Sequence, residues 1–228
     1  MSDHYFTETP ASAHAPQAFS FAYRGHALRF ETDAGVFSRD AVDKGTQLLL
    51  EALPENFTGR ALDLGCGWGA VGACMAAAWP GAQVLLTDVN ARAAELARQN
   101  LRANGLSAEV SQGDGLSTVP SSFDLIALNP PIRAGKAVVY RLFEESAARL
   151  TPDGALLVVI RKQQGAESAL RYLRTLLADV QVVRRGGGFW VLRGSKSHKH
   201  QSVTSPGIPP TETTPLGNAL QALSQKMR

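Results

Sequence analysis

The chain has 228 residues, 44% hydrophobic and 19% charged, a composition typical of one soluble α/β domain with a sizeable core. No apolar run reaches the roughly 18 residues that a membrane-spanning helix needs, and no basic segment followed by an apolar stretch opens the chain, so we expect no membrane contact and no secretory signal. Cys66 and Cys74, the only cysteines, lack metal-site spacing and are too few for a disulfide framework, so we expect no metal and a cytoplasmic location.

The net charge of +3 is unevenly distributed along the chain. Residues 1–130 carry 8 Lys and Arg against 14 Asp and Glu, residues 131–193 carry 11 against 5, and residues 194–228 carry 4 against 1. A basic half beside an acidic half favours one face that attracts a polyanion such as nucleic acid, although solvated basic helix faces give the same count.

Short apolar segments alternate with amphipathic ones along most of the chain. A β-hairpin is predicted at 19–23 and 27–32, followed by a helix over 39–53 with Ser38 as its N-cap. Four further helices are predicted at 70–79, 91–104, 136–150 and 166–178, the third followed by a turn over 151–154. The remaining strands are predicted at 61–64, 83–87, 108–111, 123–128, 155–160, 180–183 and 189–192.

This order predicts a doubly wound, Rossmann-like α/β fold with a mainly parallel sheet, closed by an antiparallel pair of terminal strands and preceded by a small N-terminal β-hairpin. Residues 1–17 are polar and read as a flexible N-terminus, residues 18–194 as one domain, and residues 195–228, rich in Ser, Thr, Pro, Lys and His, as a disordered tail. In such a sheet ligands bind beyond the carboxyl ends of the strands.

The first motif is a glycine turn, Asp63-Leu-Gly-Cys-Gly-Trp-Gly69, between a strand and a helix. Glycines allow a sharp turn and close approach of the backbone to a ligand, and Asp88 follows about 20 residues later at a strand end, as a ribose-binding acid does. A nucleotide-type cofactor is therefore expected, and the spacing from Gly65 to Ala70 also fits a loose dinucleotide fingerprint.

Asp63 favours S-adenosylmethionine (AdoMet) over a dinucleotide. A carboxylate two residues before the first glycine repels a pyrophosphate, whereas it attracts the sulfonium and ammonium groups of AdoMet. The alternative is that Asp63 only caps the following turn. Asp114, in a Gly-Asp-Gly turn after the next strand, is positioned to accept from an adenine amino group or is an ordinary turn residue.

The second motif is Asn129-Pro-Pro-Ile132, at the end of the strand predicted over 123–128. The two prolines remove two backbone donors and fix φ, which leaves a rigid loop rich in acceptors. The Asn129 side-chain oxygen and the Pro130 carbonyl can accept both hydrogens of an amino group and turn its lone pair toward a methyl donor, which is catalysis by positioning.

Together these motifs resemble class I AdoMet-dependent methyltransferases that act on amino groups. The wider pattern is similar to the RsmC-like group, the enzymes with a "methyltransferase small" domain that methylate guanine N2 in small-subunit (16S) ribosomal RNA, and the similarity covers about residues 4 to 193. It rests on His4-Tyr-Phe, Gly35-Val-Phe-Ser38, Asp43-Lys-Gly-Thr-Gln-Leu-Leu-Leu50, the two motifs above, Asp88-Val-Asn90, the extension to Lys136, and the stretch from Val159 through Lys162-Gln-Gln-Gly-Ala166.

The resemblance implies a seven-stranded sheet with an antiparallel last strand, an rRNA or small-subunit substrate, and a role for each motif residue. Asp63, Gly65, Cys66 and Gly67 would hold the methionyl part of AdoMet, Asp88 with Val89 the ribose, and Asp114 the adenine. Asn129, Pro130 and Pro131 would form the catalytic loop that holds the target amine, and Asn129 would also contact AdoMet.

The chain departs from the family pattern after the two prolines, where many amino methyltransferases have an aromatic residue that stacks on the target base. Here that residue is Ile132, which is expected to contact the substrate but cannot stack as a ring does, so another ring, such as Phe37, is a candidate for stacking. The amino-terminal half that helps two-domain members bind RNA has no counterpart in this sequence. Phosphate contacts are therefore expected from basic residues that follow two adjacent strand ends, namely Arg133, Lys136, Arg161 and Lys162.

Three alternatives remain open from the sequence. The same chemistry could act on glutamine in a protein or on adenine N6, although Ile132 is atypical there. An NAD-dependent oxidoreductase would need a catalytic His or a Tyr-x-x-x-Lys pattern, which the sequence lacks. A non-enzymatic RNA-binding module would not need the intact Asn129.

Overall fold

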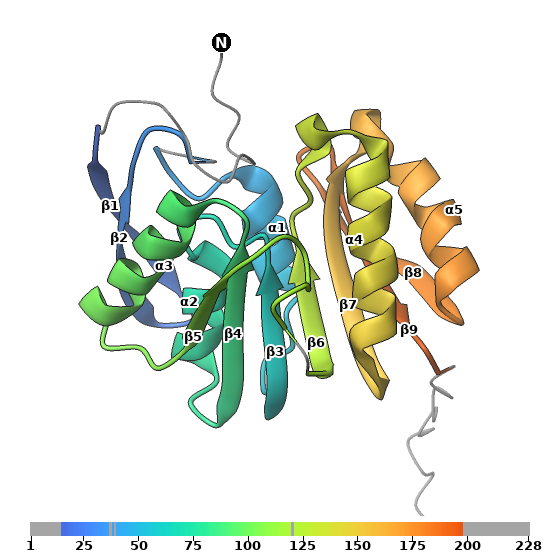
Figure 1. Ribbon diagram of the computed structural model, residues 1–228, viewed down its shortest axis with the longest axis horizontal. Helices are drawn as coiled ribbons and strands as arrows, with labels where there is room; N and C mark the ends of the chain where they lie inside the picture. The colour runs from blue at the N-terminus through green and yellow to red at the C-terminus, as the bar shows by residue number, and fades with distance from the viewer. Residues whose placement is uncertain (1–14, 37, 39, 120, 198–228) are drawn as a thin grey trace, which may run out of the picture. The chain divides into compact units, whose positions relative to one another are not determined.

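The computed structural model describes residues 15–36, 38, 40–119 and 121–197, and the predictions for the two terminal segments fall mostly outside them. The chain forms a two-stranded sheet and a seven-stranded sheet with helices on both faces (Figure 1). The elements, in order, are β1 (Gln17–Tyr23), β2 (His26–Thr32), α1 (Lys44–Ala52), β3 (Gly59–Leu64), α2 (Ala70–Ala78), β4 (Ala82–Asp88), α3 (Ala91–Ala103), β5 (Glu109–Gln112), β6 (Phe123–Leu128), η1 (Ile132–Ala134), α4 (Lys136–Arg149), β7 (Leu150–Arg161), η2 (Lys162–Gln164), α5 (Ala166–Leu176), β8 (Asp179–Gly186) and β9 (Phe189–Ser195).

The strands of the large sheet lie in the order β5-β4-β3-β6-β7-β9-β8. The neighbours from β5 to β7 are parallel, and β9 runs antiparallel to both β7 and β8. The predicted fold class is therefore confirmed, both for the mainly parallel sheet with an antiparallel last strand and for the N-terminal hairpin. The order reverses between β3 and β6, which is where an α/β sheet binds its ligand.

Side chains alternate between the two faces of the sheet, as expected for strands covered on both sides. On β3, Ala61 packs with α1, α2 and α3, whereas the next residue, Leu62, packs with α4 and α5. Both residues are fully buried, so apolar side chains on β3 are covered on both faces of the sheet.

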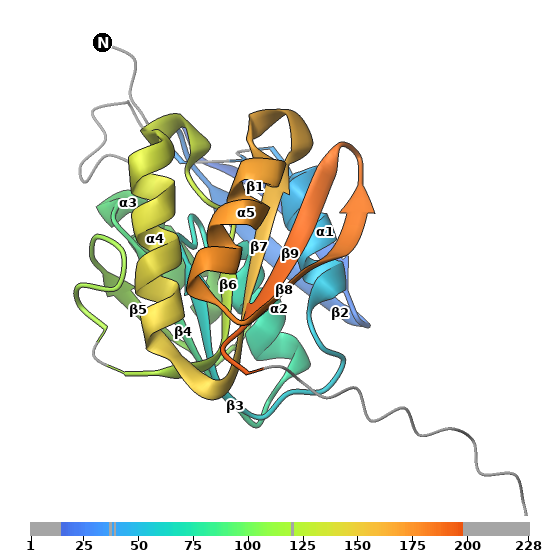
Figure 2. The same ribbon diagram turned by 90° about the vertical axis from the view of Figure 1, so that its right-hand side faces the viewer.

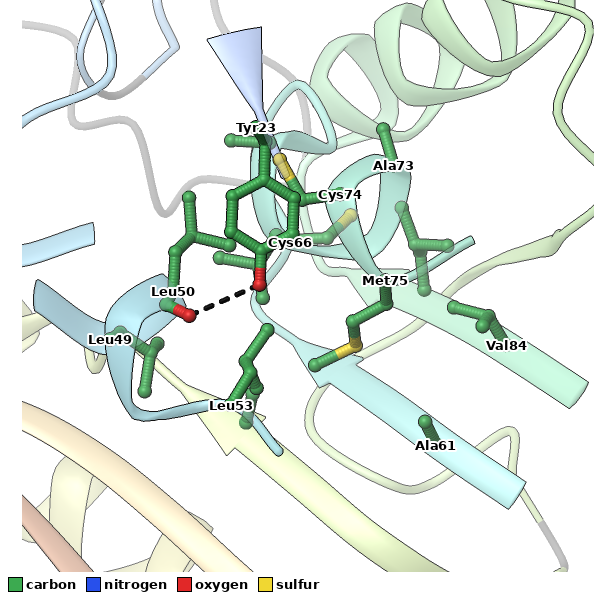
Figure 3. Close-up of a cluster of buried hydrophobic side chains, with 14 of the residues drawn as sticks. Tyr23, Leu49, Leu50, Leu53, Ala61, Cys66, Ala73, Cys74, Met75 and Val84 are labelled. Atoms are coloured by element: carbon green, nitrogen blue, oxygen red, sulfur yellow. Dashed lines mark hydrogen bonds between the residues drawn. The ribbon is translucent and has the colours of Figure 1, made fainter. Parts of the chain in front are cut away.

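The N-terminal hairpin is attached to the first of these clusters through its aromatic residues. Tyr23, at the end of β1, is buried against α1 and α2, and its hydroxyl donates to the Leu50 carbonyl at 3.1 Å (Figure 3). Burial raises the pKa of Tyr23 to about 12. Phe30 of β2 lies with its ring centre 4.9 Å from that of Trp68, so the hairpin also covers the glycine turn from behind.

The start of α1 differs from the prediction. The helix begins at Lys44, and its N-cap is Asp43, whose carboxylate accepts from the backbone of Gly45 and Thr46 at 2.9 and 3.1 Å. The predicted cap, Ser38, has a left-handed φ of 56° and donates to the Ala41 carbonyl instead. An N-cap needs extended backbone, so the prediction of a helix over 39–53 is wrong at its beginning.

The predicted turn over 151–154 is also wrong. These residues lie inside β7, where Phe123 of β6 pairs with Leu150 and Leu125 pairs with Ala155. Residues 151–154 therefore form an extended irregularity within the strand, in which the Thr151 hydroxyl donates to the Asp124 carboxylate at 2.9 Å. Pro and Gly are typical of turns, but they are also found at bulges.

Candidate active site

A cavity of about 340 Å³ opens at the carboxyl ends of β3, β4, β5 and β6. This is within the usual size range of small-molecule sites. The predicted cofactor and catalytic residues are brought together around it: Asp63, Gly65, Cys66, Gly67, Asp88, Val89, Asp114, Asn129, Pro130 and Pro131 all line its wall. The expectation that the unusual residues after the strands converge on one edge of the sheet is therefore met.

The glycine turn is fixed to the end of β4. The N–H groups of Gly65 and Cys66 both donate to the Thr87 carbonyl, at 2.8 and 3.0 Å. Gly65 and Gly67 have left-handed φ values of 69° and 55°, and a Cβ on either would meet no atom within 4 Å. These two glycines are therefore required by the backbone conformation, and the space beside them is open to a ligand. Burial raises the pKa of the Cys66 thiol, which stays protonated.

Asp63 is only 3% exposed and lies at the bottom of the cavity. Its Oδ2 accepts from the Gly72 N–H in α2 at 2.7 Å, and Oδ1 has no hydrogen-bond partner among the described residues. Burial raises the pKa of Asp63 to about 7, opposed by the Gly72 hydrogen bond and assisted by the nearby Asp88 charge. Asp63 thus stabilises the start of α2 and also leaves one carboxylate oxygen for a cationic ligand.

Asp88, at the end of β4, holds the two loops of the cofactor side together. Its Oδ2 accepts from the Gly67 N–H and its Oδ1 from the Asn90 N–H, both at 2.8 Å. Burial raises its pKa, and these two backbone hydrogen bonds act in the opposite direction. Each carboxylate oxygen keeps a second lone pair, which is the acceptor capacity that a ribose diol needs.

Asp114 is exposed and ion-paired with Arg141 of α4 at 2.6 Å. Arg141 also binds Glu145, whose second oxygen accepts from the Leu116 N–H at 2.9 Å. These charged hydrogen bonds, led by the one to Asp114, raise the pKa of Arg141. The loop that carries Asp114 is therefore attached to α4 at two points, and Asp114 retains one oxygen that Arg141 does not use.

Asn129, which directly follows β6, belongs to a short hydrogen-bonded chain. Its Nδ2 donates to Thr46 Oγ1 at 3.0 Å, and Thr46 Oγ1 donates to Asp43 Oδ2 at 2.5 Å. Because the amide nitrogen is engaged by Thr46, the amide orientation is set and Oδ1 remains as an acceptor. Asn129, Thr46 and Asp43 all line the cavity.

The rest of the Asn-Pro-Pro loop is closely packed. The Pro130 carbonyl accepts from the Ile132 N–H at 2.9 Å, which uses one of its two lone pairs. Ile132 is half-buried against the core beneath α4 and α5, and it is not part of the cavity wall. Phe37, the other candidate for contact with a base, lies outside the described residues.

The predicted phosphate contacts surround the cavity without entering it. Arg133, Lys136, Arg161 and Lys162 are all exposed, and none lines the cavity. Lys136 Nζ lies 4.9 Å from the centre of the Tyr140 ring. In the part of the chain that the structure describes, none of the four has an ion-pair partner.

Several residues of the cavity wall were not predicted to be part of the site. Asp43 and Thr46 belong to a motif that carried the family resemblance, and the Asp-x-x-Thr spacing is a typical helix start. Arg141 has a weaker signal, a glutamate four residues later on one helix face. Within the described ranges no group of three or more His, Cys, Asp or Glu is placed to hold a metal, and no helix is long and apolar enough to cross a membrane.

A seven-stranded sheet of this order, with a glycine turn and two acids at the carboxyl ends of β3 and β4, defines a class I AdoMet-dependent methyltransferase. The sequence comparison agrees, because the family described as methyltransferase small domain matches residues 27–193. The chain belongs to this family, and AdoMet is its methyl donor.

Three similar proteins illustrate the family. An uncharacterized protein of Bacillus subtilis, YbxB, is 40% identical over 86% of this chain and 100% of its own length. Ribosomal RNA small subunit methyltransferase C of Pseudomonas entomophila is 35% identical over 80% of this chain and 58% of its own. The solved T. thermophilus 16S rRNA N2 G1207 methyltransferase (RsmC), in complex with AdoMet and guanosine, is 30% identical with a TM-score of 0.73, covering 80% of this chain and 51% of that one. The chain thus spans about half the length of the rRNA methyltransferases that it matches.

Proposed function

We propose that this protein transfers the methyl group of AdoMet to the N2 amino group of a guanine in small-subunit ribosomal RNA. The observation that carries the proposal is the Asn129 amide, which lines the same cavity as Asp63 and is oriented by Thr46. Asp43, Thr46, Asn129 and Pro130 form what we call the acceptor wall, and the Asn129 amide oxygen that it offers is an uncharged acceptor, which suits the recognition of a neutral amino group.

The residues on the cofactor side fit AdoMet. The unpartnered oxygen of Asp63 suits a cationic group, the two acceptor oxygens of Asp88 suit a diol, and the open space above Gly65 and Gly67 admits a close ligand. Thr87 Oγ1 supports the same fit, since in the described residues it is the one buried side-chain polar atom without a partner, and Thr87 lines the cavity. AdoMet supplies an electrophilic methyl group when it is bound.

The acceptor side works by positioning. The Oδ1 atom of Asn129 and the second lone pair of the Pro130 carbonyl accept the two hydrogens of the target amine, which aims the nitrogen lone pair into the cavity. Thr46 is a positioning residue, because it prevents the Asn129 amide from turning its nitrogen toward the substrate. The amine needs no strong base beforehand, since its nitrogen loses a proton readily once it is alkylated.

The guanine and rRNA parts of the proposal rest on the relatives. Two proteins that are 30% and 35% identical to this chain are described as methyltransferases of 16S or small-subunit rRNA. The solved structure of the 30% identical protein contains guanosine. The excess of positive charge over residues 131–193 supports a polyanionic substrate.

The test is transfer of labelled methyl from AdoMet to ribosomal subunits purified from a strain that lacks this protein, followed by nucleoside analysis. We expect N2-methylguanosine in small-subunit RNA. Methylation of adenine N6 or of a protein glutamine would replace the proposed substrate with another amine. Asn129→Ala is the matched control, expected to bind AdoMet normally and to lose turnover by roughly 100-fold or more, as when a positioning group is removed.

A further inference from the structure

Five cations gather at one corner of the molecule, at the tip of the β8–β9 hairpin. We call this group, Lys44, Arg161, Lys162, Arg184 and Arg185, the basic edge. All five side chains are exposed. Figure 2 shows the hairpin tip at the same end of the molecule as the segment that joins β7 to α5, and beside α1.

The strand register brings these residues together. Phe189 of β9 pairs with both Arg161 of β7 and Gly186 of β8, and the next residue, Trp190, pairs with Arg185. Lys162 donates its backbone N–H to the Gly188 carbonyl at 2.8 Å. The aliphatic part of Lys44 lies 3.7 Å from where a Cβ on Gly187 would stand. The basic edge is therefore one contiguous feature built from three strands and the start of α1.

The cations of the basic edge form no ion pair with the carboxylates that the structure describes. By contrast, Arg92, Arg98, Arg102 and Arg141 all lie within ion-pair distance of a carboxylate. Unpaired cations at the end of one hairpin attract a polyanion, which supplies the missing negative charge.

Two of the guanidinium groups lie against aromatic rings. The Arg161 Cζ is 5.6 Å from the centre of the Phe189 ring, and the Arg185 Cζ is 4.8 Å from the centre of the Trp190 ring. Stacking on a ring restricts an arginine, so less entropy is lost when it binds a phosphate. The tip itself, Gly186 to Gly188, is exposed and without side chains, so a strand of nucleic acid can approach its backbone closely.

The basic edge borders the acceptor wall of the cavity. Phe189 packs against Gly45, since a Cβ on that glycine would lie 2.9 Å from the Phe189 ring. The next residue, Thr46, is the one that holds Asn129. A phosphate bound to Lys44 or Arg161 is therefore next to the first turn of α1, which carries the residue that orients Asn129.

We propose that the basic edge binds the phosphodiester backbone of the RNA strand that carries the target base, and so delivers the base to Asn129. This inference rests on the proposed function for its substrate class. The new element is the binding surface: the β8–β9 hairpin and the start of α1 hold the RNA strand.

The test compares Arg184→Gln/Arg185→Gln with Arg60→Gln/Arg174→Gln, which removes the same charge from the start of β3 and the last turn of α5. Binding of a labelled single-stranded RNA is measured by fluorescence anisotropy between 50 and 300 mM KCl. Two lost phosphate contacts are expected to lower the slope of log affinity against log salt by about 1.4, and to weaken binding about tenfold near 0.15 M. The control pair is expected to behave as the unmodified protein.

AdoMet affinity, measured by calorimetry, and the melting temperature are expected to stay unchanged in both pairs, because none of the four residues lines the cavity. Equal slopes for the hairpin pair and the control pair would overturn the role of the basic edge. A second pair, Arg161→Gln/Lys162→Gln, guards against an effect of Arg185 on the Trp190 packing and is expected to give the same loss. RNA binding is measured without turnover. A negative result for the basic edge can therefore be distinguished from a negative result for the proposed reaction, which is the absence of N2-methylguanosine.

Discussion

The buried carboxyl of Asp63 makes AdoMet binding depend on pH. Its pKa is raised to about 7 because it is buried, and only the ionised form attracts a cation. Each pH unit below 7 reduces the ionised fraction about tenfold, so we expect AdoMet to bind roughly 100-fold more weakly at pH 5 than at pH 8. Calorimetric titration at pH 5, 6, 7 and 8 measures this directly, and Asp63→Asn should abolish the pH dependence and keep the weaker affinity throughout.

The same group should affect the stability of the free protein in the opposite sense. Between its ordinary pKa of 3.8 and the folded value of about 7, the folded state retains a proton that the unfolded state has lost, so stability falls as pH rises through this window. The rise of the Asp63 pKa from 3.8 to about 7 corresponds to a loss of roughly 4 kcal/mol in the free energy of unfolding across this window. Asp63→Asn keeps an oxygen for the Gly72 N–H and avoids burying a charge, so without AdoMet it should unfold at higher urea than the parent at pH 8, but not at pH 4. A flat AdoMet titration in the parent, or tight binding by Asp63→Asn at pH 8, would refute this reasoning.

Three further substitutions test the packing of the site. Thr46→Val is expected to lower turnover by about tenfold without changing AdoMet affinity, since it removes the hydroxyl that links the Asn129 amide to Asp43, and Thr46→Ser should restore most of the rate. Gly72→Ala should destabilise the fold by roughly 1–3 kcal/mol in urea unfolding, because its Cβ would stand 2.3 Å from a leucine side chain of β4. Arg141→Gln should weaken AdoMet binding by no more than about fivefold, because its ion pair with Asp114 is largely exposed; a larger loss in calorimetry would mean that Arg141 itself contacts the ligand.

The predictions that succeeded depend on local patterns. The strands and helices from β3 onward follow from short apolar runs alternating with amphipathic ones, and an α/β sheet places the residues after each strand along one edge. That rule alone was enough to bring Asp63, Asp88 and Asn129 to one cavity. Asp114 could be placed in the same way, but its ion pair could not, because Arg141 follows it by 27 residues and belongs to another element.

The predictions that failed concern features that are determined by tertiary contacts between residues distant in the sequence. Ser38 and Asp43 are both good N-cap residues by type, and the choice between them is made where the chain leaves the N-terminal hairpin with Ser38 in a left-handed conformation. Likewise, Pro152 and Gly154 are typical of a turn, yet Leu150 and Ala155 on either side of them pair with β6, and the segment between stays within β7. Ile132 was considered as a contact for the base, and its position against the core is set by packing beneath α4 and α5.

The first turn of α1 connects three parts of the site through consecutive residues. Asp43 uses one carboxylate oxygen to cap the helix and the other to hold the Thr46 hydroxyl, so the start of the helix and the orientation of the Asn129 amide depend on the same side chain. Between them, Lys44 contributes to the basic edge and Gly45 receives the Phe189 ring. A shift of the helix start by one residue would move all of these groups at once. The position of this N-cap is therefore constrained by the chemistry of the acceptor wall as well as by the stability of the helix.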